Sequence, residues 1–284
     1  MKSETRGRIL LITTAVLWGL AGVCVKSITW GTMSISAARS LVSLLMILSA
    51  KRELRIHFTK INFLGGLMLS LTGILYVEAI KLTTAGTAIV LQYIAPILVF
   101  LYEVIFRKKK PAVWEVVLTG CVFLGVIVTF ADSIDMTQIL GNILALASGF
   151  TFAAHILAMN QQDSDSSDCT AIGNAITVLI CLPFMLKDPA LSFDRTNLIW
   201  ILILSVFQYG LANVLFAKGC KLINDIEGSL ILTIEPIFTP IPVAIICGEK
   251  MGVLAIIGAI IVIISVTLYG IIPKLTEKKK HPKA

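Results

Sequence analysis

The chain alternates between long apolar runs and short polar or charged segments. A helix needs about 20 mainly apolar residues to cross about 30 Å of hydrocarbon, and the long runs are of about that length. Cutting the sequence at its charge clusters and turn residues predicts ten transmembrane helices. They cover residues 9–25, 32–50, 61–80, 84–106, 112–131, 138–158, 169–186, 197–217, 227–247 and 251–272.

The composition supports this interpretation. Hydrophobic residues make up 57% of the 284 positions and charged residues 14%, whereas a soluble globular domain carries about 25% charged residues. We therefore expect an all-α integral membrane protein. The basic residues before the first run resemble the start of a signal peptide. That run continues beyond an ordinary h-region, so we interpret it as an uncleaved anchor.

The basic residues indicate how the chain is oriented. Most of them fall on the same side of the predicted spans as the N-terminus, including Arg107–Lys110 and the lysines of the tail. Because cytoplasmic loops carry an excess of lysine and arginine, both termini are expected in the cytoplasm. The acidic loop Gln161–Asp168 is discordant, but acidic residues contribute little to this rule. The net charge of +7 then follows from topology, so we expect the lipid bilayer, and no nucleic acid, as a partner.

A shift of 140 residues brings the chain into register with itself. It pairs Lys81 with Lys221 and Pro96 with Pro236, and both residue types are scarce in membrane spans. Two repeats of five helices each would enter the membrane from opposite sides, because five is an odd number. Inverted repeats of this kind build many secondary transporters, which bind their substrate near the midplane. The predicted repeats are residues 1–134 and residues 135–284, the second with a basic cytoplasmic tail.

The stretch from Leu232 to Pro240 places a carboxylate and two prolines inside a predicted span. Glu235 lies near the membrane centre, where a charged side chain costs several kcal/mol unless it faces a partner or water. We therefore expect Glu235 to line a cavity, where it could bind a proton or a cationic group. A permanent bond to a neighbouring helix is the alternative. Pro236 removes a backbone hydrogen bond, so it and its repeat mate Pro96 are candidate hinges.

Other polar and aromatic side chains are candidates for the same cavity, and each also has a structural interpretation. Gln92 could line the cavity or form a hydrogen bond between helices. Tyr209, Asn213 and Phe216 could belong to a pocket or to a packed aromatic stripe. His155 is expected to be a cavity-mouth residue or a packing histidine, with a proton relay as the alternative. The full set of substrate-binding candidates is Trp18, Arg39, Tyr76, Gln92, Tyr93, His155, Tyr209, Asn213 and Glu235.

Arg39 and Glu78 add charges toward the outer ends of their predicted spans. Arg39 could clamp a substrate carboxylate with two hydrogen bonds, or it could pair with Glu78 and hold two helices together. We expect the structural ion pair. Glu78 can also meet Lys81 on the surface of the same helix, because the two are three residues apart. Glu78 and Glu235 are the candidates for proton coupling.

Two segments resemble a known family. "AIKLTTAGTAIVLQYIAPILVFLYEVIF" in the first half and "KLINDIEGSLILTIEPIFTPIPVAIICGEKM" in the second are similar to the paired repeat of the drug/metabolite transporter superfamily, EamA type. Trp18–Leu20 and Arg39 resemble its first two helices. Glu249 matches the acid that ends the second repeat, where the first half has Lys109. The resemblance implies a ten-helix permease of the inner or plasma membrane that exports small metabolites by alternating access.

Together these features predict a secondary transporter that exports a small polar metabolite, an amino acid or an amine-like solute, with proton or exchange coupling. The alternatives are an intramembrane enzyme and a channel or scaffold subunit. The chain has no HExxH, GxSxG or GxxxxGK[ST] motif, so an enzyme is not expected. The six cysteines show no CxxC spacing, so we expect no metal site and no cofactor. The expected assembly is a monomer or a homodimer.

Overall fold

The computed structural model describes residues 3–50, 56–108, 110–131, 136–159, 161, 163–220, 222, 231 and 234–280. Within these residues the regular structure is helical, as expected, and includes no strand. The helices before residue 132 are α1 (Ser3–Gly19), α2 (Ala21–Ser27), α3 (Thr32–Ala50), α4 (Lys60–Leu82), α5 (Ala85–Gln92), α6 (Ile94–Ile105) and α7 (Val113–Ala131). The helices after residue 135 are α8 (Met136–Met159), α9 (Ser166–Met185), α10 (Arg195–Leu202), η1 (Ile203–Leu211), α11 (Ala212–Cys220), α13 (Ile234–Phe238), α14 (Pro240–Cys247) and α15 (Val253–Lys280).

Eight helical segments in the described part of the chain are long and apolar enough to cross a membrane. They coincide with the first eight predicted spans. A shorter apolar helix lies at the tenth predicted span, and the ninth is described only over α13 and α14, because residues 227–230 and 232–233 lie outside the described residues. The eight segments are Glu4–Ser27, Thr32–Ser49, Lys60–Leu82, Ala85–Ile105, Val113–Ala131, Gln138–Met159, Ser166–Met185 and Arg195–Phe216.

Threonine side chains fix the starts of two of these helices. Thr59 Oγ1 accepts a hydrogen bond from Asn62 N (3.0 Å) at the start of α4. Thr84 Oγ1 accepts one from Thr87 N (3.0 Å) at the start of α5. The first backbone N–H groups of a helix have no partner within it, so these contacts stabilise the helix ends where the sequence changes from polar to apolar.

The fourth span is broken close to Pro96, one of the two candidate hinges. α5 ends at Gln92 and α6 begins at Ile94, with Tyr93 between them. Pro96 has no N–H, so the carbonyl of Gln92 loses the helical hydrogen bond that it would otherwise accept. The break therefore falls about one turn before the proline.

The ninth span is also interrupted. α13 and α14 are separated by Thr239, directly before Pro240. Pro236, a candidate hinge, is buried inside α13, and the turn before it includes residues that lie outside the described part of the chain. The break between α13 and α14 lies next to Pro240, the second proline of the stretch from Leu232 to Pro240.

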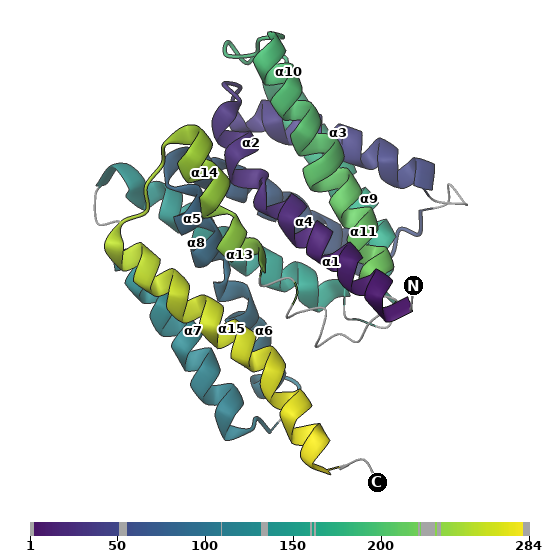
Figure 1. Cartoon of the computed structure of the whole chain (residues 1–284). Helices are drawn as coiled ribbons and strands as arrows, with labels where there is room; N and C mark the ends of the chain where they lie inside the picture. The colour runs from purple at the N-terminus through teal and green to yellow at the C-terminus, as the bar shows by residue number, and fades with distance from the viewer. Residues whose placement is uncertain are drawn as a thin grey trace.

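The helices pair mainly between the two ends of the chain. α4 packs against α8 and α9, and α3 also packs against α9. α1 lies along α11, and α7 lies along α15 in the lower part of Figure 1. Each of these pairs joins a helix before residue 132 to one after residue 135. The two segments predicted as repeats therefore interlock.

Glycines allow two of these pairs to approach closely. A Cβ atom at Gly66 would lie 2.9 Å from Cys169 O and 2.9 Å from Gly173 N, both backbone atoms of α9. A Cβ atom at Gly125 would lie 2.7 Å from Val262 Cγ2 of α15. Small residues at such positions let helix backbones come together, which is a main source of stability between helices in lipid.

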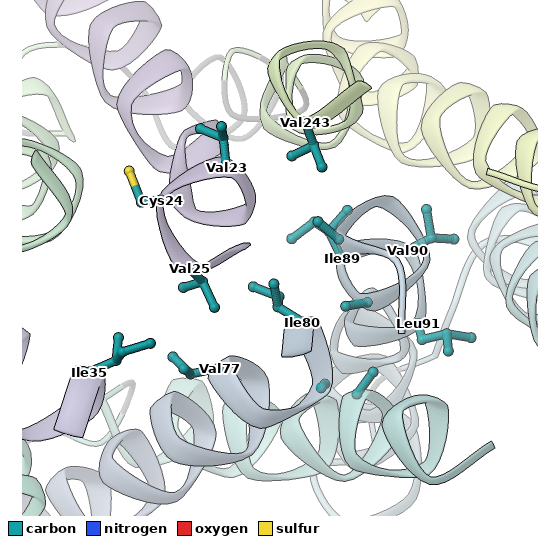
Figure 2. Close-up of a cluster of buried hydrophobic side chains, with 14 of the residues drawn as sticks. Val23, Cys24, Val25, Ile35, Val77, Ile80, Ile89, Val90, Leu91 and Val243 are labelled. Carbon is teal, nitrogen blue, oxygen red and sulfur yellow. The ribbon is translucent and has the colours of Figure 1, made fainter. Parts of the chain in front are cut away.

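A cluster of buried apolar side chains lies where α2, α4, α5 and α14 meet (Figure 2). Val23, Ile80, Ile89 and Val243 contribute one side chain from each of these helices, and all are at most 2% exposed. α2 follows α1, so the cluster lies toward the end of the bundle away from the N-terminus (Figure 1).

Candidate functional site

Glu235, the acid expected within a span, lies in the short helix α13. Its side chain is half-buried, and its carboxylate forms no hydrogen bond or ion pair within the described residues. The backbone carbonyl of Glu235 accepts hydrogen bonds from Thr239 N and Thr239 Oγ1, both at 2.8 Å. A carboxylate that lies deep in the protein without such a partner has to be neutralised or solvated.

Side chains from four other segments surround this region. Tyr76 of α4 and Tyr93, between α5 and α6, interact electrostatically with Glu235. Arg39 of α3 interacts in the same way with Tyr76 and with Tyr209 of η1. We name these five residues the central polar cluster. The three tyrosines and Glu235 lie deep in the protein, and each keeps part of its surface accessible.

Arg39 contacts an aromatic ring, where we expected an ion pair with Glu78. Its side chain is 5% exposed, and its Cζ lies 4.8 Å from the centroid of the Tyr209 ring, a cation–π arrangement. Gly73 leaves room for the guanidinium, because a Cβ atom there would lie 2.6 Å from Arg39 Nη2. Within the described residues no ion pair joins Arg39 to Glu78, which interacts with Lys81 instead. The predicted ion pair is therefore wrong, because the guanidinium is directed to Tyr209 and Gly73.

Tyr209 lies in the π-helical segment η1. Such turns are rare and occur frequently at functional sites. Two side chains of the predicted stripe of Tyr209, Asn213 and Phe216 have different partners. The Tyr209 ring lies against the Arg39 guanidinium. The Phe216 ring packs against the Trp18 ring, with the two centroids 5.2 Å apart. Asn213 is half-buried, and its side chain has no hydrogen bond within the described residues.

Gln92 and His155, two other candidates, form hydrogen bonds between helices. Gln92 Nε2 donates to Ser148 Oγ of α8 (3.1 Å). His155 is 5% exposed, and its Nδ1 donates to Gly65 O of α4 (2.8 Å). For both residues the structure favours the interpretation in which the side chain joins two neighbouring helices.

Two buried polar side chains of η1, Ser205 and Gln208, were not among the sequence candidates. Gln208 Nε2 donates to Trp18 O (3.4 Å). Gln208 Oε1, Ser205 Oγ and Arg39 Nε are buried and have no hydrogen-bond partner within the described residues. A glutamine inside the apolar run "ILILSVFQYG" was the available signal, because amide side chains are scarce in membrane spans.

A hollow of about 580 Å³ lies elsewhere, at the starts of α4 and α9. At its edge the exposed His57 places Nδ1 3.2 Å from Asp168 Oδ2. No residue of the central polar cluster borders this hollow. In the described part of the chain no group of three or more His, Cys, Asp or Glu side chains could hold a metal ion. The hollow is lined by His57, Thr59, Lys60, Ile61, Asn62, Asp163, Ser164 and Asp165.

Comparisons with known proteins agree with the membrane architecture. A model of the EamA-like transporter family matches residues 5–131 and again residues 139–271. The "Uncharacterized inner membrane transporter YicL" of Salmonella typhimurium (strain LT2) is 22% identical over 291 residues, which cover 95% of this chain and 97% of that protein.

A solved structure described as "Crystal structure of protein" is also similar. It has a TM-score of 0.69 and 13% sequence identity, and the match covers 96% of this chain and 99% of the other. At this identity the likeness concerns the fold alone.

Proposed function

The chain belongs to the EamA-like transporter family, and on that premise we propose that it exports a small polar metabolite, an amino acid or an amine-like solute, by alternating access. The family and the similarity to an inner membrane transporter point to a multi-pass transporter of the inner membrane and not to an enzyme. As a secondary transporter, it would use a proton gradient or solute exchange.

The proposed architecture is ten spans in two inverted repeats, residues 1–134 and 135–284, with both termini in the cytoplasm. The family model matches the chain twice in succession, and the gap between the matches, residues 132–138, falls at the proposed boundary. α13 with α14 would form the ninth span and α15 the tenth. Lys221, which pairs with Lys81 in the proposed repeat, lies outside the described residues.

The carboxylate of Glu235 is the observation that carries the proposal. It is deep, half-buried and without a hydrogen bond or ion pair within the described residues. The ammonium group of a substrate and a proton are the two partners that could neutralise it in turn. The rings of Tyr76 and Tyr93 attract a cation, and Arg39 offers a guanidinium to a substrate carboxylate. Glu78, half-buried beside Lys81, is the second candidate for proton coupling.

The interruptions of the fourth and ninth spans are the proposed hinges. Tyr93 lies three residues before Pro96, and Thr239 lies three residues after Pro236. Both interruptions adjoin the central polar cluster, because Tyr93 belongs to it and Glu235 bonds through its carbonyl to Thr239. A change in helix direction at these points would therefore move cluster residues.

Transport by the purified protein in proteoliposomes tests the proposal. The substrate panel holds amino acids, amines and neutral metabolites, and the variants are Glu235→Gln and the control Glu115→Gln. Glu115 accepts hydrogen bonds from Ala112 N and Tyr269 Oη at the start of α7. We expect Glu235→Gln to slow transport of a cationic or zwitterionic substrate about tenfold or more, as the loss of a charge-assisted contact implies. Glu115→Gln should transport at the wild-type rate.

The opposite result is equally clear. If Glu235→Gln transports every accepted compound as fast as the wild type, Glu235 does not bind the substrate or the coupling ion. A protein that moves none of the panel in the wild-type form would contradict the proposed substrate class.

A further inference from the structure

α2, α5 and α14 meet at the end of the bundle that lies away from the N-terminus (Figure 1). Lys26 is in the last turn of α2, and Glu249 lies between α14 and α15. Lys26 Nζ lies 2.8 Å from Glu249 Oε1, and the two side chains are 21% and 17% exposed. This ion pair joins the first span to the end of the proposed ninth span.

The same two charges also bind the turn between α4 and α5. Lys26 Nζ donates to Thr83 O (2.7 Å), the carbonyl of the residue that caps the C-terminus of α4. Ala85 N, at the N-terminus of α5, donates to Glu249 Oε2 (2.9 Å). A cation at a helix C-terminus and an anion at a helix N-terminus are both stabilised by the helix dipole. The turn therefore favours this placement of the two charges over the reverse.

The three helices are tightly packed beside these contacts. A Cβ atom at Gly22 would lie 2.7 Å from Ala85 Cβ and 2.9 Å from Val243 Cγ2. Val23, Ile89 and Val243 are at most 2% exposed, and Figure 2 shows them where α2, α5 and α14 approach one another. We name the contact between Gly22, Ala85 and Val243 the seal.

We propose that Lys26, Glu249 and the turn Thr83–Ala85 form a latch that holds the transporter closed on the membrane face opposite its N-terminus. The inference rests on the alternating access proposed above, which requires this end to open. Opening separates α2 from α5 and α14, and it breaks the ion pair and both bonds to the turn together. Because the two side chains keep some exposure, water solvates the separated charges, which keeps the energetic cost of opening small.

The turn between α4 and α5 determines which of the two positions has to hold the cation and which the anion. The double exchange Lys26→Glu with Glu249→Lys keeps an ion pair, but it sets an anion against the Thr83 carbonyl and a cation against the Ala85 N–H. An ion pair that acts alone would tolerate this exchange. A latch that depends on the two helix ends would not.

The test follows the alkylation rate of one thiol in the seal. Val243→Cys is introduced into the full chain with its native cysteines replaced by alanine, and the protein is placed in lipid nanodiscs, where a water-soluble maleimide reaches both faces. Glu249→Gln and Lys26→Met weaken the latch. Lys250→Met removes the adjacent exposed charge and is the matched control. Size-exclusion elution and the thermal midpoint show that each variant is folded.

We expect Glu249→Gln and Lys26→Met each to raise the alkylation rate about tenfold, the factor that the loss of a charge-assisted hydrogen bond implies. Lys250→Met should leave the rate unchanged, and the double exchange should react as fast as the single variants. Equal rates in all variants, or an equal acceleration by Lys250→Met, would overturn the latch. Protection restored by the double exchange would overturn the role of the turn.

The latch and the transport proposal fail separately. The alkylation assay needs no substrate, so a negative result leaves the proposed transport standing. A negative result with Glu235→Gln would leave the measured protection of the seal unchanged.

Discussion

Four polar side chains inside the spans differ in whether a neighbouring helix supplies a hydrogen-bond partner. Gln92 and His155 find partners on α8 and α4. The Glu235 carboxylate and Arg39 Nε find no hydrogen bond within the described residues. All four could be predicted as polar groups in an apolar setting. Which of them meets a neighbouring helix depends on how each helix is rotated in the bundle, and the pattern of one sequence does not determine that rotation.

His155 is expected to stabilise the fold without taking part in transport. His155→Asn removes the bond to Gly65 O that joins α8 to α4. A buried hydrogen bond contributes about 1 kcal/mol, so the thermal midpoint of the purified protein should fall by a few degrees. The transport rate and its pH dependence should match those of the wild type. A variant with an unchanged midpoint and lost transport would return His155 to the substrate path.

Two irregularities in the transmembrane helices differ in whether a residue in the sequence signals them. The break between α5 and α6 has a visible signal in Pro96, because proline removes a backbone donor wherever it occurs. The π-helical turn of η1 has no comparable signal, since residues of ordinary helix propensity fill it apart from Gly210. Its position is consistent with packing: the backbone of Gly210 in η1 lies against the Met46 side chain of α3, a contact between residues far apart in the chain.

Close contact between α4 and α9 is expected to depend on Gly66. Gly66→Ala would bring a Cβ atom against backbone atoms of Cys169 and Gly173, which cannot move without separating the helices. We expect a loss of about 1–3 kcal/mol in the free energy of unfolding, the usual cost of overpacking. Gly120→Ala is the matched control, because a Cβ atom there meets nothing within 4 Å.

Thermal or denaturant unfolding of the two glycine variants in detergent measures this difference. Gly120→Ala should be as stable as the wild type or slightly more stable, because alanine favours the helix over glycine. Equal destabilisation by the two substitutions would show that the α4–α9 contact is not the limiting one.

In the described part of the molecule, helices from the first half of the chain pack against helices from the second half. Composition and the length of the apolar runs were sufficient to predict a multi-pass helical membrane protein, and the first eight spans agree with the structure. The pairing of α4 with α9 and of α7 with α15 was not predictable, because apolar residues face both lipid and protein in a membrane helix. This interlocking brings five distant segments together in the central polar cluster and places the proposed latch at one end of the bundle.

The central claim is that the cluster lines a water-filled path that opens to each side of the membrane in turn. The most direct measurement labels a single Tyr76→Cys thiol, in a chain without native cysteines, with a membrane-impermeant reagent added either outside or inside proteoliposomes. Phe123→Cys is the control, since Phe123 is 50% exposed on α7 and should face lipid. We predict that Tyr76→Cys reacts from both sides and is protected by substrate, while Phe123→Cys reacts from neither. Reaction of Tyr76→Cys from one side only, or from neither side, would contradict the claim.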